Sequence, residues 1–141
     1  MNSESTVLVV ANVTATSREL IDALKDRATR GPCRFSLVVP TKQAAEGGQT
    51  RAPERLEEAL NRMRQEGLSV EGGEVVDFDP VAAVMAAWDR SKFDEIVVST
   101  LPPGTSKWLE ADVPERLRQQ TGAPVEHVIA TGSAWKTFAR S

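Results

Sequence analysis

The chain has 141 residues and a net charge of -3, and apolar residues make up 40% of it and charged residues 26%. This length suits one globular domain, the acidic balance excludes the basic face that nucleic-acid binding needs, and no apolar run approaches the roughly 20 residues that span a bilayer. The amino terminus lacks a signal-peptide pattern. A single cysteine, Cys33, excludes an internal disulfide, and we expect its thiol to be buried because it lies at the start of an apolar strand. These features predict a cytoplasmic protein.

Strands and helices alternate from the start of the chain. Residues 6–11 (TVLVVA) form a short β-branched run that is typical of a strand buried on both faces. Thr16 and Glu19 have the spacing of a capping box and predict a helix start, and the Gly-Pro pair at 31–32 ends that helix. Residues 34–39 (RFSLVV) predict the second strand.

A polar loop follows from Pro40 to Ala52, and it is either a lid over a site or a surface insertion. The next helix opens at Pro53 and has two different faces. Its Arg and Glu face, which includes Arg55, predicts a solvated surface. Its apolar face consists of Leu56, Ala59, Leu60 and Met63.

The third strand, residues 69–76, is interrupted by Gly72 and Gly73, which favours a bulge or bend at a sheet edge. Asp79 and Pro80 then predict a helix start, with the aspartate as N-cap and the proline at the first helical position. An apolar stripe follows, and we expect its tryptophan to serve in packing. The stripe consists of Val81, Val84, Met85 and Trp88.

The carboxyl-terminal part repeats the alternation. Residues 95–100 (EIVVST) predict the fourth strand. Asp112 and Glu115 then have the spacing of a second capping box, and the helix that they open ends at Gly122. The fifth strand runs from Val125 to Ala130 (VEHVIA).

This alternation predicts a single-domain three-layer α/β/α sandwich with a five-stranded, largely parallel sheet. The domain covers residues 1–130, and residues 131–141 form a tail without a clear pattern. In open α/β folds, ligands bind where the carboxyl end of a strand meets the next helix. We therefore expect any small-molecule site to include the loop between Ser99 and Asp112.

Five segments resemble the universal stress protein family, in the same order and over nearly the whole chain. They are VLVVAN at the start, the Asp-Pro helix opening at 79–80, EIVVST, DVPERL and APVEHVIA. The resemblance implies the strand order 3-2-1-4-5 and an adenine-nucleotide site at the ends of the first and fourth strands. It also implies a homodimer that pairs through the strand from Val125 to Ala130.

The family's nucleotide loop has the form G-x2-G-x9-G followed by Ser or Thr. Counted back without gaps from the last helix, the matching positions hold Val98, Leu101, Ala111 and Asp112, so that none keeps the motif residue. Prolines at 102 and 103 remove two backbone N–H donors from the loop. The Asp112 carboxylate would lie beside phosphate oxygens, and two like charges about 4 Å apart repel by about 1 kcal/mol even in water.

The turn after the first strand also differs from the family. Nucleotide-binding members have Asp-Gly-Ser there, and this chain has Asn12, Val13 and Thr14. Asn12 can still hydrogen-bond a base or ribose, but Val13 disfavours a turn that used the φ range of glycine. If the nucleotide site is kept, its residues are Asn12, Pro40, Gly104, Thr105, Ser106 and Lys107, since the last four retain donors and one cation.

No catalytic or metal-binding arrangement is evident in the sequence. The single histidine, His127, lies within the fifth strand, where we expect a partly buried or interface side chain. Ser99 and Thr100 end the fourth strand, but no base is evident in the sequence to activate their hydroxyls. The spacings of cysteine and histidine that bind metals are absent.

The sequence therefore predicts a non-enzymatic, universal-stress-protein-like domain that binds a partner protein or regulates the stress response, without a cofactor. The alternative is an adenine-nucleotide sensor or weak ATPase that binds ATP or AMP through residues 104–107. In either case we expect a homodimer, because the last strand is an apolar sheet edge whose Val125, Val128 and Ile129 a two-fold partner would cover. The alternative is that the tail folds back and covers this edge with Trp135 and Phe138.

Overall fold

The structure is a computed structural model that describes residues 4–12, 14–41, 52–76, 79–90, 93–102, 108 and 112–130, apart from the side chains of residues 52, 89 and 90. Nine helices and strands fall within these ranges. They are β1 (Ser5–Val10), α1 (Arg18–Thr29), β2 (Cys33–Pro40), α2 (Ala52–Gln65), β3 (Val70–Val76), α3 (Pro80–Arg90), β4 (Glu95–Thr100), α5 (Val113–Thr121) and β5 (Val125–Ile129).

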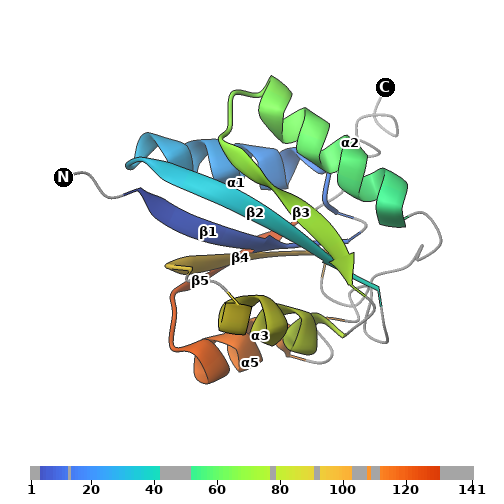
Figure 1. The fold of residues 1–141 in the computed structure, drawn as a ribbon, viewed down its shortest axis with the longest axis vertical. Helices are drawn as coiled ribbons and strands as arrows, with labels where there is room; N and C mark the ends of the chain where they lie inside the picture. The colour runs from blue at the N-terminus through green and yellow to red at the C-terminus, as the bar shows by residue number, and fades with distance from the viewer. Residues whose placement is uncertain are drawn as a thin grey trace.

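The five strands form one parallel sheet in the order β3-β2-β1-β4-β5. Helices α1 and α2 lie on one face of this sheet, and α3 and α5 lie on the other (Figure 1). The predicted fold class and strand order are confirmed. The predicted strand and helix bounds agree with the observed ones to within one or two residues.

The central strand β1 supplies both hydrophobic cores. Its odd-numbered residues, such as Val7 and Val9, pack with α1 and α2, whereas Leu8 and Val10 pack with α3 and α5. All four of these side chains are fully buried. The continuous β-branched sequence of β1 follows from this burial on both faces, because neither face of the strand meets water.

The edge strand β3 contains the irregularity that the two glycines predict. Its register against β2 shifts between Phe35 and Ser36, so that Glu71 has no register partner. A Cβ atom on Gly73 would lie 2.6 Å from the backbone oxygen of Leu37 and 2.8 Å from a methyl carbon of Leu56. Glycine is therefore required at this position for α2 to approach the sheet.

The three predicted helix starts differ in outcome. Asp79 Oδ1 accepts a hydrogen bond from the Ala82 N–H at 2.8 Å, which confirms this cap. The predicted Thr16 cap is wrong by one residue, because Ser17 Oγ accepts from the Leu20 N–H at 3.1 Å. The Ser17 N–H donates to the backbone oxygen of Thr14, so the turn before α1 extends one residue further than expected. Ser17 is therefore the N-cap residue in place of Thr16.

The predicted capping box at Asp112 is also wrong. Asp112 lies at the N-cap of α5 with φ 57° and ψ 39°, and its side chain makes no cap hydrogen bond. An aspartate caps a helix from the extended region of backbone space, and the left-handed conformation turns its carboxylate away from the first turn. Gly122 ends α5, as predicted, and it has the left-handed conformation.

Two single residues have the predicted structural roles. The Trp88 ring stacks on Phe93 with 6.0 Å between the ring centroids, which is a packing contact. Cys33 is buried, and desolvation raises the pKa of its thiol, so that the protonated form is favoured at neutral pH. None of the helices in the described ranges is long and apolar enough to cross a membrane.

Candidate functional site

The strand order reverses between β1 and β4, and this point is where open α/β folds bind ligands. Four polar side chains gather at the carboxyl ends of these two strands: Asn12, Thr14, Ser99 and Thr100. Each is at most 4% exposed. Because buried polar groups require hydrogen-bond partners, the partners of these four side chains define the chemistry of the site.

A hydroxyl pair spans the crevice between the two strands. Thr14 Oγ1, in the turn after β1, lies 2.6 Å from Ser99 Oγ, near the end of β4. Both residues are buried, so water does not compete for this bond. The two hydroxyls therefore bind each other across the place where a ligand would enter.

Each end of the Asn12 amide makes a hydrogen bond within the chain. Its Nδ2 donates to the backbone oxygen of Pro40 at 2.7 Å, and its Oδ1 accepts from Nη1 of Arg55 at 2.7 Å. The structure thus brings together two of the predicted site residues, Asn12 and Pro40, through a direct hydrogen bond. These bonds join the end of β1 to the end of β2 and to the first turns of α2.

The prediction that Arg55 lies on a solvated surface is wrong. Arg55 is half-buried and belongs to the site through its bond to Asn12. Its position in the first turns of α2 is the sequence signal for this role, because helices in a parallel sheet begin near the carboxyl ends of the strands. Because Arg and Glu alternate along α2, Arg55 could not be distinguished in the sequence from its exposed charged neighbours.

Backbone donors in the turn after β1 are also used internally. The Ala15 N–H donates to Asn12 O, and the Ser17 N–H donates to Thr14 O, both at 3.0 Å. The Leu20 N–H is taken by the Ser17 hydroxyl. Each of these three N–H groups therefore already has an acceptor in the protein.

A hydrogen bond between a hydroxyl and an imidazole joins β4 to β5, and the sequence did not reveal it. Thr100 Oγ1 lies 2.8 Å from Nε2 of His127, whose side chain is half-buried as predicted. Burial lowers the pKa of His127, and the positive charge of Arg118 lowers it further, so that the imidazole is neutral at pH 7. Thr100 is fully buried, which denies an outside substrate access to its hydroxyl. We therefore assign the pair a structural role.

The predicted loop residues Gly104, Thr105, Ser106 and Lys107 lie outside the described residues, as does Val13. Asp112 is described, and its side chain is exposed at the start of α5. Among the described residues, no group of three or more His, Cys, Asp or Glu side chains is placed to hold a metal ion.

Comparison with known proteins gives matches among solved structures only. Neither the protein-family models nor the curated proteins match this sequence. A universal stress protein in complex with cAMP superposes with a TM-score of 0.68 at 20% identity, over 92% of this chain and 100% of the other. The chain has the universal stress protein fold.

Two further structures of the universal stress protein fold support this conclusion. The protein from Archaeoglobus fulgidus in complex with dAMP gives a TM-score of 0.61 at 15% identity, over 91% of this chain and 99% of that one. An Arabidopsis thaliana family protein with AMP bound gives 0.63 at 14% identity, over 92% and 94%. These identities establish the shared fold, and each of the three proteins holds an adenine nucleotide.

A first prediction concerns the hydrogen bond between the hydroxyls of Thr14 and Ser99. Replacing Thr14 with valine, or Ser99 with alanine, leaves one buried hydroxyl without its partner, which costs about 1–3 kcal/mol of unfolding free energy. The double variant removes both hydroxyls, so we expect it to lose less than the sum of the two single losses. Urea denaturation of the four proteins measures the coupling, expected at about 0.5–3 kcal/mol. Strictly additive losses would show that the two hydroxyls do not interact.

The His127 pair makes a second prediction. Its folded pKa lies below the ordinary value of about 6.5, so the unfolded chain binds the proton first as the pH falls. The neutral imidazole therefore contributes stability to folding at pH values above the unfolded pKa. This contribution is lost as the pH falls through the folded pKa. We expect the urea midpoint to decrease less on acidification in His127→Gln than in the unaltered protein.

NMR titration of the single histidine measures the same shift directly. Arg118→Gln removes the neighbouring positive charge and should raise the midpoint, whereas Arg116→Gln on the same helix is the matched control and should leave it unchanged. A midpoint at or above the ordinary value in the unaltered protein would contradict the burial of this imidazole.

Proposed function

We propose that this chain is a non-enzymatic regulatory domain of the universal stress protein type, which acts in the stress response by binding a partner protein and has lost the adenine-nucleotide site. The observation that carries the proposal is the occupied amide of Asn12. Its Nδ2 donates to Pro40 and its Oδ1 accepts from Arg55, at the position where the family's site begins. These bonds take one of the two N–H donors and one of the two acceptor positions of the amide, and a nucleotide would have to compete with them for that part of the group.

The rest of the crevice supports the same proposal. Thr14 and Ser99 close the crevice with their own hydrogen bond. The loop after β4 differs from the nucleotide motif at every matched position, and Asp112 adds a carboxylate at the start of α5. Removing any one of these obstacles leaves the others in place.

A second candidate function is favoured by the structural neighbours. Three of them hold cAMP, dAMP and AMP, and all share the fold of this chain. On this alternative, the domain is an adenine-nucleotide sensor or weak ATPase. Asn12 would then exchange the bond to Arg55 for a bond to the ligand, and the guanidinium would face the phosphates.

Thermal denaturation with ATP and magnesium, with AMP and with cAMP separates the two functions. A ligand at about 100 times its dissociation constant stabilises a protein by about 2.7 kcal/mol, which is a shift of several degrees for a domain of this size. We expect no dose-dependent shift with any of the three ligands. A saturable shift would overturn the proposed loss of the site and support the sensor.

A restored variant shows whether the loop is the obstacle. Leu101→Gly, Ala111→Gly and Asp112→Ser together return three of the four motif residues, and they should bring back a measurable ATP shift. If this variant folds normally and still ignores ATP, the obstacle lies outside the three restored positions, and the candidates are Val13 and the internal bonding of the crevice. Arg55→Ala in the restored variant then frees the oxygen of Asn12 and should recover binding.

We also propose that the protein forms a homodimer through β5. The strand lies at the edge of the sheet, and two backbone hydrogen bonds fix its orientation: Ile96 N–H donates to Pro124 O, and Ala130 N–H donates to Thr100 O. Peptide groups alternate along a parallel ladder, so those of residues 125, 127 and 129 point away from β4. They are the groups that a partner strand would bind.

The expectation that Val125, Val128 and Ile129 share one dimer face is wrong. Val128 packs into the core on the α1 side, and Val125 packs against the core on the α5 side. Alternate side chains of a strand point to opposite faces of the sheet, so residues 125 and 128 are not on one face. Ile129 is half-buried and lies in neither core cluster, which makes it the better residue for testing the interface.

The dimer is tested by light scattering at micromolar concentration. Ile129→Lys places a charge on the edge strand and should shift the mass from dimer to monomer, because edge lysines block strand pairing. The control is Gln119→Lys, which adds the same charge on the exposed surface of α5 and should stay dimeric. A monomer mass for the unaltered chain would overturn the proposal, and a dimeric Ile129→Lys would move the interface elsewhere.

A further inference from the structure

Strand β5 forms one edge of the sheet, beside β4 (Figure 1). Its backbone hydrogen bonds to β4 involve even-numbered residues, such as Pro124 and Ala130. The peptide groups of residues 125, 127 and 129 therefore point outward, where a further strand would bind them. The homodimer proposed above uses this edge, and the spacing of the outward groups determines how two copies can pair.

The pairing segment of this edge has a defined beginning. Pro124 has no N–H group, and the N–H of Ala123 already donates to Thr121 Oγ1 at 3.1 Å. The first outward donor that a partner strand can use is therefore the N–H of Val125. The strand itself ends at Ile129, so its outward residues lie symmetrically about His127.

This symmetry favours one register for the dimer. A two-fold axis perpendicular to the sheet pairs two copies of β5 in antiparallel orientation. Two opposite residues then exchange both backbone hydrogen bonds only where both have outward peptide groups. An axis at His127 places residue 125 opposite residue 129 of the partner and uses every outward group of the strand. Moving the axis by one residue would leave residue 125 or residue 129 opposite a residue outside the strand.

The side chains agree with this register. Val125 packs against the core on the α3 and α5 side of the sheet, and alternation along the strand places His127 and Ile129 on the same side. An axis at His127 brings Val125 opposite the partner's Ile129, which is an apolar pair that stabilises a sheet. It also brings the two imidazoles opposite each other, with about 5.5 Å between their Cα atoms.

The charges around His127 oppose a further positive charge at this axis. Arg118 of α5 lies on the imidazole side, where it pairs with Glu115 at 2.7 Å, and burial together with Arg118 lowers the pKa of His127. The neighbouring carboxylate of Glu126 lies on the other face of the sheet, 3.8 Å from Arg30 of α1. Two neutral imidazoles can lie opposite each other, whereas like charges directly opposite destabilise a strand pair.

We propose that two copies of this chain pair about an axis that passes between their His127 side chains, and that the subunits separate when both imidazoles are protonated. The contact is then a pH-sensitive one, in which a histidine pair controls association. This arrangement rests on the homodimer proposed above, and it adds the register of that dimer and its response to acid.

Sedimentation between about pH 8 and pH 5 tests the response to acid, because this range spans the ordinary histidine pKa. The separated subunits bind more protons than the dimer. The dissociation constant should therefore rise as the pH falls, by about tenfold per pH unit for each proton taken up. His127→Gln should remain dimeric in acid. Glu126→Gln, the control on the other face of the strand, should keep the pH dependence. Far-UV circular dichroism at each pH shows that the chain stays folded.

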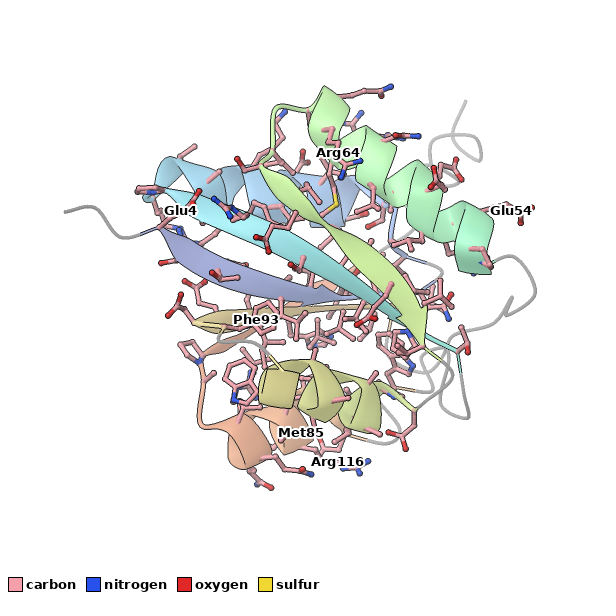
Figure 2. The ribbon with its side chains drawn as sticks, in the orientation of Figure 1. Glu4, Glu54, Arg64, Met85, Phe93 and Arg116 are labelled. Atoms are coloured by element: carbon pink, nitrogen blue, oxygen red, sulfur yellow. The ribbon has the colours of Figure 1, made fainter. Side chains whose placement is uncertain are left out.

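Two charged variants at one position test the register. His127→Lys and His127→Glu should each be monomeric alone, because like charges would lie opposite at the axis. Mixed together they should form a heterodimer, since lysine then lies opposite glutamate. Both variants remove the imidazole from Thr100, so this loss cannot explain a difference between the separate and the mixed proteins. The control is Arg116→Glu, on the side of α5 that faces away from the sheet (Figure 2), and it should stay dimeric.

The outcomes separate this arrangement from the homodimer itself. A folded protein whose dissociation constant is the same across the pH range, or whose acid dissociation persists in His127→Gln, would overturn the role of His127. Charged variants that dimerise alone, or a mixture of them that stays monomeric, would move the axis away from this residue. Each of these results leaves the homodimer standing. A monomeric mass for the unaltered chain at neutral pH would instead overturn the homodimer, and this arrangement with it.

Discussion

Polar side chains that end the central strands of this sheet lie out of reach of water, and each must find a partner within the protein. An unpaired buried amide or hydroxyl costs about 1–3 kcal/mol. The chain meets this requirement across strands: Asn12 binds the end of β2, Thr14 binds β4, and Thr100 binds β5. The carboxyl end of the sheet is thereby tied together from β2 to β5. This bonding also occupies the groups with which the fold would hold a ligand.

The amino end of the sheet is stabilised by a different chemistry. Arg27 of α1 forms three hydrogen bonds of 2.7–3.0 Å with Glu95 at the start of β4, and only 10% of the Arg27 side chain is exposed. Asp94 accepts from the Thr6 N–H at 2.8 Å on the neighbouring strand. Full charges thus hold the amino end, whereas neutral hydroxyl and amide groups hold much of the carboxyl end. Because neutral bonds are weakly sensitive to salt, closure of the crevice should persist at high ionic strength.

Local patterns in the sequence predicted the layers and most boundaries, because a strand buried on both faces and an apolar helical stripe are visible within a few residues. The strand order was implied by the resemblance to the universal stress protein family. The cap of α1 was misplaced because Thr16 and Ser17 are neighbouring hydroxyl residues with the same capping chemistry. The left-handed backbone of Asp112 was missed because aspartate more often caps from the extended conformation.

The side-chain pairs of the crevice could not be predicted from the sequence in the same way. Thr14 and Ser99 are 85 positions apart, Asn12 and Arg55 are 43 apart, and Thr100 and His127 are 27 apart. No spacing rule joins residues at such separations. Asn12 was identified because it stands where the nucleotide-binding members of the family have an aspartate, and only the fold shows that its amide binds Pro40 and Arg55.

The β3 edge of the sheet differs from the central strand β1 in how strongly it resists local opening. Strand β1 has a paired strand on each side and full burial on both faces, so exposing it to solvent requires the whole domain to unfold. Strand β3 has one neighbour, a shifted register and an uncovered groove on one face, while Gly73 lets α2 lie close on the other. Amide hydrogens of β3 should therefore exchange with solvent well before those of β1. Substitutions in β3 would change local opening more than global unfolding, which leaves this strand freer to vary among related sequences than the centre of the sheet.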